Sequence, residues 1–134
     1  MNARLSDVMD AINALSKWAF EIAKDKGFHD EEVPISQALM LINTELCECY
    51  EATRNGKDFG QIDYKELFAL EEGKTEEFIP TFEKRYKDSP EDELADAVIR
   101  IFDLAGQLNI NLGLAILSKM TYNLQRPHKH GKRF

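Results

Sequence analysis

Apolar residues recur at helical spacing along most of this chain of 134 residues. The first such stripe predicts a helix from about Leu5 to Lys26 that Gly27 ends; it consists of Leu5, Val8, Ile12, Leu15, Ala19 and Ile22. The second predicts a helix that begins near Pro34 and ends at Asn55-Gly56; it consists of Ile35, Leu39, Ile42, Leu46 and Cys49.

Two further helices are expected in the last third of the chain. The run Ser89-Pro90-Glu91-Asp92 predicts a helix start, because it combines a capping serine, a first-turn proline and two acids that complement the helix dipole. The buried stripe expected for this third helix is Leu94, Val98, Ile101, Ala105 and Leu108. A short turn at 109–111 leads to a fourth helix from about Leu112 to Gln125, and one face of it carries Leu112, Ile116, Lys119, Asn123 and Arg126.

The segment 57–88 differs from the rest, because it holds nine acidic and six basic residues and only two short helical patterns. These lie at Tyr64–Phe68 and Phe78–Phe82, and Gly73 and Pro80 interrupt them. We interpret the segment, called the excursion below, as short helices that pack on the main body or on another subunit. Because no segment alternates as a strand does, the sequence predicts one all-α domain over 1–134, an antiparallel helical bundle with a basic, irregular tail at 127–134.

Composition narrows the classes of partner. The formal net charge of −7 argues against binding to a nucleic-acid polymer, whose protein partners are usually basic. No apolar run reaches the roughly 18 residues of a membrane helix, and the start Met1–Asp7 lacks a signal-peptide core. Cys47 and Cys49 point in different directions on a helix, so we interpret them as free, partly buried thiols. We expect a cytoplasmic protein with no membrane partner.

Two acidic pairs carry the candidate chemistry: Glu45-x-x-Glu48 on the second helix and Glu93-x-x-Asp96 on the third. Residues three apart share a helix face, so packing these two helices together would bring four carboxylates into one small volume. Such a cluster repels itself unless protons or cations join it. Ligands that are all oxygen suit Mg²⁺ or Mn²⁺. One to three such cations could hold a triphosphate and acidify a water for attack on phosphorus.

Candidate phosphate contacts lie on the fourth helix, where Lys119, Asn123 and Arg126 share one face. Arg54 and Arg100 are further candidates. Each feature also has a plain structural interpretation: acidic pairs are often solvated helix faces, and a basic last turn complements the helix dipole. Trp18 could stack on a base, although an aromatic residue in a bundle is usually core packing.

A di-iron bundle is the rival metal chemistry, and it would need a Glu-x-x-His motif on its helices. The three histidines are His29, His128 and His130, and none lies three residues after a helical glutamate. A di-iron oxidase is therefore not expected.

Taken together, these motifs resemble the MazG-like, all-α nucleoside triphosphate pyrophosphohydrolases. The resemblance is carried in order by Glu45-Leu46-Cys47-Glu48, by Glu93-Leu94-Ala95-Asp96 and by Lys119-x-x-x-Asn123-x-x-Arg126, followed by Pro127-His128-Lys129-His130-Gly131-Lys132. The C-terminal segment from Asn123 to Lys132 is similar to that of small stand-alone and phage-type members. The match covers most of the chain outside the excursion. The excursion lies between the two acidic motifs, so the linker between them is longer here than in many members of the family.

The resemblance implies a four-helix core completed by homo-oligomerisation, as a dimer or a tetramer. It implies Mg²⁺, or else Mn²⁺, held by Glu45, Glu48, Glu93 and Asp96, with Glu48 or a neighbour activating water. It implies that Lys119 and Asn123 contact phosphates, with Arg126 as a further candidate. It places the base pocket near Trp18 and Asn43.

The expected function is hydrolysis of a (d)NTP between the α- and β-phosphates, which gives a (d)NMP and pyrophosphate and clears nucleotides from the pool. The alternative is a non-catalytic helical module, either a nucleotide sensor or an oligomeric adaptor that uses the excursion as its partner surface. A purely structural four-helix protein is the third possibility.

Overall fold

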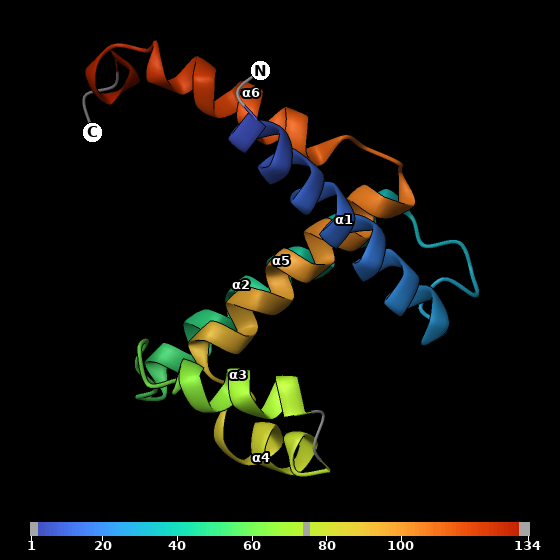
Figure 1. The fold of residues 1–134 in the computed structure, drawn as a ribbon, viewed down its shortest axis with the longest axis vertical. Helices are drawn as coiled ribbons and strands as arrows, with labels where there is room; N and C mark the ends of the chain where they lie inside the picture. Colours follow the sequence, from blue (N-terminus) through green and yellow to red (C-terminus); the bar gives the residue numbers. More distant parts are fainter. Residues whose placement is uncertain (1–2, 74–75, 132–134) are drawn as a thin grey trace. The chain divides into compact units, whose positions relative to one another are not determined.

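The computed structural model describes residues 3–73 and 76–131, and over these residues it contains helices and no strand (Figure 1). The all-α class predicted from the sequence is therefore confirmed. The elements are α1 (Ala3–Asp25), α2 (Ile35–Arg54), α3 (Tyr64–Gly73), α4 (Phe78–Arg85), α5 (Pro90–Gln107), α6 (Leu112–Leu124) and the short 3₁₀ helix η1 (His128–Gly131). The tail was expected to be irregular, but its first part forms η1; residues 132–134 lie outside the described part.

These helices form two compact units, and each is described by itself. Unit 1 consists of Met1–Val33 and Ile101–Phe134, and unit 2 consists of Pro34–Arg100. Helix α5 is common to both, since its residues up to Arg100 belong to unit 2 and its last two turns belong to unit 1. Within the described residues no individual helix is long and apolar enough to cross a bilayer, although α5 and its bent continuation α6 pass that test when taken together.

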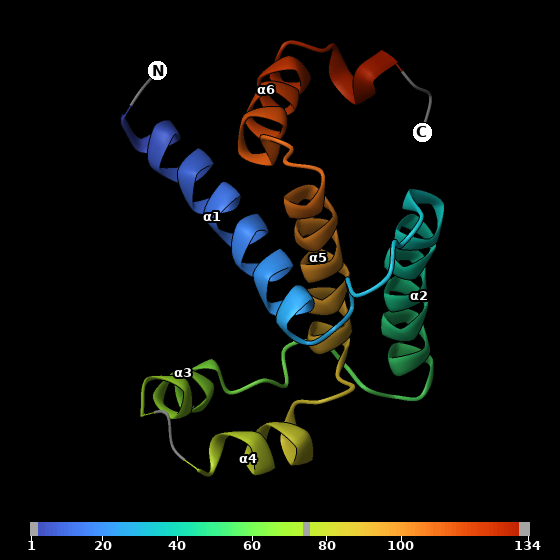
Figure 2. The same cartoon turned by 90° about the vertical axis from the view of Figure 1, so that its right-hand side faces the viewer.

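Unit 1 is built on close packing of α1 against α6, and Gly106 near the end of α5 approaches Ser16 of α1 (the three helices are labelled in Figure 2). Two glycines allow this approach. A Cβ atom on Gly106 would lie 2.4 Å from the backbone oxygen of Ser16, and one on Gly113 would lie 2.4 Å from the backbone oxygen of Met9. No side chain fits at either distance, so the helix backbones themselves are in contact.

Two asparagines fix the same packing by hydrogen bonds. The Asn13 amide donates to Asn111 Oδ1 at 2.9 Å, and its own Oδ1 accepts the Gly113 N–H at 2.9 Å. Asn111 is the N-cap of α6 and accepts the Leu114 N–H at 3.0 Å. One polar pair therefore caps α6 and holds it against α1.

A histidine closes the other end of unit 1. His29, in the turn after α1, lies 2.8 Å from Asp103 on α5 through Nε2 and Oδ1. Its ring also packs edge-on against Phe20, with the ring centroids 4.9 Å apart. The sequence predicts no role for His29, because a partner 74 positions away leaves no local pattern.

In unit 2, the excursion forms a hairpin of α3 and α4. The Glu66 carboxylate on α3 accepts hydrogen bonds from Arg85 and from the buried Tyr86 hydroxyl at the end of α4. The Phe82 ring lies 5.8 Å from that of Phe78 and 6.1 Å from that of Tyr86, so three aromatic rings follow one another along α4 and its C-cap. The excursion therefore has a small core of its own.

One predicted interruption of the excursion was wrong. Gly73 ends α3 as expected, but Pro80 lies inside α4, at its third residue. A proline is tolerated in the first turn because the N–H groups there have no partner within the helix.

The stripe predicted to be the buried face of α5 is largely open. Leu94 is 45% exposed and Val98 is 40% exposed, and Ile101 and Leu108 are exposed to the same degree. Only Ala105 is buried, so this prediction was wrong for four of the five residues. The buried positions on the unit 2 part of α5 are instead Pro90, Glu93 and Ala97, three and four residues apart. This part of α5 therefore buries the side that carries an acid and leaves its branched apolar side chains open.

Candidate metal centre

Three carboxylates from α2 and α5 meet inside unit 2. Glu45 and Glu48 on α2 and Glu93 on α5 each offer one carboxylate oxygen, and these oxygens all lie within 4.8 Å of one another. The spacing of three places Glu45 and Glu48 on one side of α2. The two helices are in contact there, because the Cys49 thiol lies 3.3 Å from the backbone oxygen of Pro90. Three of the four predicted metal ligands are thus brought together.

Two of these three acids are buried and their surroundings differ. Glu45 is 5% exposed, and its carboxylate accepts a hydrogen bond from Arg100 Nε. Glu93 is 7% exposed, and within the described residues its carboxylate has neither a hydrogen bond nor an ion pair. Glu48 is exposed and forms the open side of the group. The arrangement therefore leaves one buried acid without a counter-charge.

The pKa of Glu93 is raised above its ordinary value of 4.5. Burial is the largest cause, followed by the negative charges of Glu48, Asp92, Asp96 and Glu45. Two full charges 4 Å apart repel by about 4 kcal/mol at an effective dielectric constant of about 20. The dipole at the start of α5 offsets only about 0.3–1 kcal/mol of this. A proton or a cation on the group would relieve the repulsion that the Arg100–Glu45 pair leaves.

Asp96 is the fourth predicted ligand, and it does not join the group within 4.8 Å. It is exposed on α5, one turn after Glu93. Its pKa is raised, first by partial desolvation and then by Asp92, Glu45 and Glu48, while Arg100 lowers it. Asp96 thus feels the negative charges of Glu45 and Glu48, but its carboxylate oxygens are not among those that lie within 4.8 Å of one another.

A second acidic group, which the sequence motifs did not predict, shares Glu93. Asp88, Asp92 and Glu93 each offer a carboxylate oxygen, and these oxygens also lie within 4.8 Å of one another. Asp88 has a φ of +58°, and its N–H donates to Asp92 Oδ2 at 2.9 Å. The residues stand close together in the sequence, but Asp92 was interpreted only as an acid that complements the helix dipole, Asp88 as the end of the excursion, and Glu93 as a ligand of the other group.

The other predicted site residues are placed as follows. In unit 1, the Lys119 ammonium lies 4.7 Å from the centre of the Tyr122 ring, and the Arg126 guanidinium lies 5.6 Å from it. Asn123 has a buried side-chain oxygen with no hydrogen-bond partner in the described structure. Trp18, also in unit 1, is 61% exposed. In unit 2, the Asn43 amide donates to the Leu39 backbone oxygen at 2.9 Å.

The remaining candidates from the sequence are engaged elsewhere or lack a partner base. Arg54 pairs with Glu51 at 2.7 Å on the surface of α2, and Arg100 pairs with Glu45. Cys47 and Cys49 are both free; Cys47 is exposed, whereas it was expected to be partly buried. Among the described contacts of the two cysteines, none supplies the base that a nucleophilic thiol would need.

The residues present fit a hard divalent cation. All the donors are carboxylate oxygens, which Mg²⁺ and Mn²⁺ prefer. Opposite ligands of Mg²⁺ stand about 4.2 Å apart, because each Mg–O distance is about 2.1 Å. Oxygens within 4.8 Å of one another are close to that span. The buried and unpartnered Glu93 carboxylate supports the same assignment, since a buried charge needs either a counter-charge or a metal.

Comparisons of the chain with protein-family models, with curated proteins and with solved structures give no match. The resemblance to the MazG-like hydrolases therefore rests on the ordered motifs of the sequence. What the geometry adds is local: it brings Glu45, Glu48 and Glu93 together.

Proposed function

We propose that this protein is a metal-dependent nucleoside triphosphate pyrophosphohydrolase. The observation that carries the proposal is the meeting of Glu45, Glu48 and Glu93, with a raised pKa at the buried Glu93. Perturbed carboxylates that converge on one point are typical of catalytic and metal-binding sites. The MazG-like order of motifs names the reaction class.

In this proposal water attacks the α-phosphorus of a (d)NTP and the bond from that phosphorus to the α,β-bridging oxygen breaks. The products are a (d)NMP and pyrophosphate, and one proton is released. Bound Mg²⁺ or Mn²⁺ supplies charge neutralisation for the phosphates and acidifies the water.

The chain's own acids have distinct parts in this scheme. Glu93 and Glu45 are buried and held by α5 and α2, so they would fix the position of the cation. Glu48 is exposed beside them, so it can accept the proton of the attacking water. Asp96 adds negative charge nearby. That Lys119, Asn123 and Arg126 contact phosphates, and that Trp18 and Asn43 adjoin the base, belongs to the same proposal and rests on the resemblance.

The decisive assay incubates the purified chain with Mg²⁺ and a panel of NTPs and dNTPs in water enriched in ¹⁸O. Attack at the α-phosphorus puts the label in the monophosphate, whereas attack at the β-phosphorus puts it in pyrophosphate. Glu48→Gln should reduce turnover at least about 100-fold, as for other groups that act in the transition state. Glu83→Gln, which removes one exposed charge from α4, is the matched control and should keep full activity.

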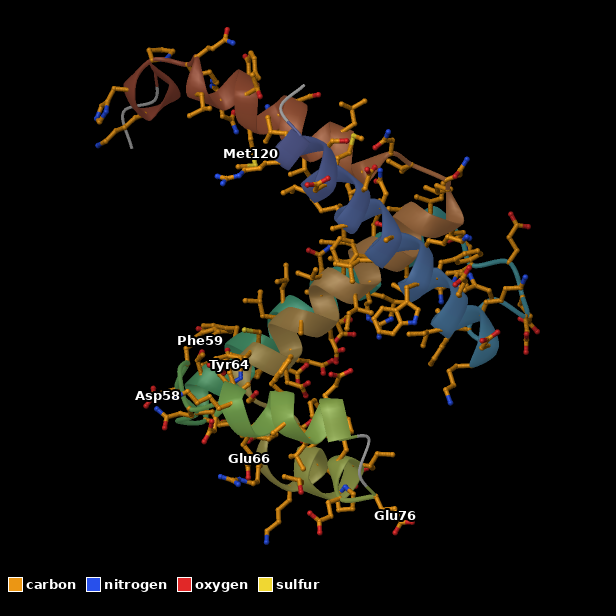
Figure 3. All side chains as sticks on the ribbon, viewed as in Figure 1. Asp58, Phe59, Tyr64, Glu66, Glu76 and Met120 are labelled. Atoms are coloured by element: carbon orange, nitrogen blue, oxygen red, sulfur yellow. The ribbon has the colours of Figure 1, made fainter. Side chains whose placement is uncertain are left out.

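The adaptor is a second candidate, because the excursion exposes several large apolar side chains. They come from the loop before α3 and from both short helices: Phe59, Tyr64, Phe68 and Ile79; Phe59 and Tyr64 are labelled in Figure 3. Deleting the excursion should then abolish binding of a partner protein and leave the rest of the chain folded. A nucleotide that binds and raises the melting temperature without release of pyrophosphate would instead favour the sensor, and either result without hydrolysis would contradict the enzyme.

A further inference from the structure

We propose that Asp88, Asp92 and Glu93 bind a second divalent cation at the start of α5. The three carboxylates offer oxygens within 4.8 Å of one another, which is the spread that Mg²⁺, Mn²⁺ or Ca²⁺ can span. Neither Asp88 nor Asp92 belongs to the motifs that carry the family resemblance. The inference deepens the proposed metal-dependent function, on which it rests, because Glu93 is common to both acidic groups.

The deciding observation is the state of Glu93. Its side chain is more than nine-tenths buried, lies in this group, and has no hydrogen bond or ion pair among the described residues. A carboxylate with two oxygens can bridge two cations, one on the side of Glu45 and Glu48 and one on the side of Asp88 and Asp92. A single cation in the first group would leave the exposed pair of Asp88 with Lys87 as the one ion pair of the second group among the described residues.

The partners of the two aspartates leave oxygens available. Asp92 Oδ2 accepts the Asp88 N–H at 2.9 Å. Asp88 Oδ1 lies 3.5 Å from Lys87 Nζ in a pair whose side chains are both mostly exposed. Such a surface pair is weak, so a divalent cation can displace the lysine. Lys57 bonds the Asp88 backbone oxygen at 2.6 Å and not its carboxylate.

A cation at this position would have a structural effect as well. Asp88 is the last residue of the excursion, and Asp92 and Glu93 lie in the first turn of α5. One ion bound to all three would tie the end of the excursion to the helix that carries Glu93. Binding should therefore slow amide exchange in residues 86–93, and this effect is readable without any turnover.

The experiment counts bound Mn²⁺ per chain by electron paramagnetic resonance and follows amide exchange with and without Mg²⁺. The wild-type chain should bind two ions. The separate variants Asp88→Asn and Asp92→Asn should bind the second ion at least tenfold more weakly and lose the Mg²⁺-dependent protection of 86–93. Asparagine tolerates the positive φ at 88 and keeps an acceptor oxygen at 92, so both variants should fold, which a melt in EDTA checks.

The controls separate this inference from the proposed enzyme. Glu83→Gln should keep both ions, and Glu48→Gln should lose the first ion while it keeps the protection of 86–93. One ion per chain in the wild type, or two ions retained in Asp88→Asn and Asp92→Asn, would overturn the second site even if nucleotide hydrolysis is observed. Two ions with the expected losses but no hydrolysis of any nucleotide would support the site and contradict the enzyme.

Discussion

Arg100 and Glu45, 55 positions apart in the chain, join α5 to α2 through a hydrogen bond from the guanidinium Nε to the buried carboxylate. The pairing gives the two buried acids of the cluster different states. Glu45 has a counter-charge from Arg100, whereas Glu93 has none among the described residues and its pKa is raised. The predictions below follow from this difference and from the packing of unit 1.

Removing the arginine should destabilise the metal-free protein. Arg100→Ala leaves Glu45 buried without its donor, which typically costs about 1–3 kcal/mol of unfolding free energy. Mg²⁺ should recover part of that loss, because the cation replaces the missing positive charge. Urea unfolding in EDTA and in Mg²⁺ measures both effects. Arg54→Ala is the matched control: it breaks the exposed pair with Glu51 and should cost at most about 1 kcal/mol in either buffer.

Neutralising the exposed Glu48 should stabilise the metal-free protein, whereas Arg100→Ala should destabilise it. Glu48→Gln removes a negative charge that raises the pKa of Glu93, so the metal-free variant should be more stable than the wild type by about 1 kcal/mol. The same variant should gain less from Mg²⁺, since it has lost a ligand. Thermal melts with and without Mg²⁺ test this, with Glu83→Gln expected to change neither value. A variant less stable in EDTA than the wild type would show that repulsion does not dominate the cluster.

The raised pKa values of Glu93 and Asp96 predict a pH dependence with a definite sign. Above the ordinary values of 4.5 and 3.8, and up to the raised values, the folded protein binds more protons than the unfolded chain. The contribution of these groups to the unfolding free energy therefore falls as pH rises through that window. Glu93→Gln should flatten the slope in EDTA. Saturating Mg²⁺ should also flatten or reverse it, because the cation favours the ionised acids.

The close helix packing of unit 1 predicts an unusual response to alanine. In an exposed helix, replacing glycine by alanine gains about 1 kcal/mol from helix propensity. At Gly106 and Gly113 the new Cβ would instead lie 2.4 Å from a backbone oxygen, so the helices must separate. Each variant should lose about 1–3 kcal/mol, as for other overpacked sites. Ser118→Ala on the exposed side of α6 should stay within about 0.5 kcal/mol, and denaturant midpoints compare all three.

The helices themselves could be predicted from the sequence because their signals are local. Pro90 begins α5, and the predicted ends of α1, α2 and α6 lie within two residues of the observed ones. The pairing of Glu45 and Glu48 with Glu93 also followed from spacing, since two acids three apart on a helix need only a neighbouring helix to meet. The excursion's two short helices were anticipated, although Pro80 was wrongly taken to interrupt one of them.

What could not be predicted was which side of each helix would be buried. The leucine and valine stripe of α5 has the stronger sequence pattern, yet Glu93 and Ala97 occupy the buried side in unit 2. Hydrophobic periodicity ranks the faces of a helix by how apolar they are, and the burial of Glu93 does not follow that ranking. The acidic group of Asp88, Asp92 and Glu93, the His29–Asp103 pair and the Asn13–Asn111 pair were not predicted for a related reason, because each depends on tertiary contacts or on a turn geometry such as the positive φ at Asp88.

Helix α5 carries Leu94 and Val98 on an open side and Glu93 on a buried one. If the proposed ions bind, a molecule that covers the open side and fixes the position of α5 would change the affinity of the acids for these ions. Linkage makes the effect mutual: a change in ion occupancy alters, by the same factor, how tightly the covering molecule is held. Titrating magnesium should therefore shift the self-association of this chain even if no ion lies at the contact surface.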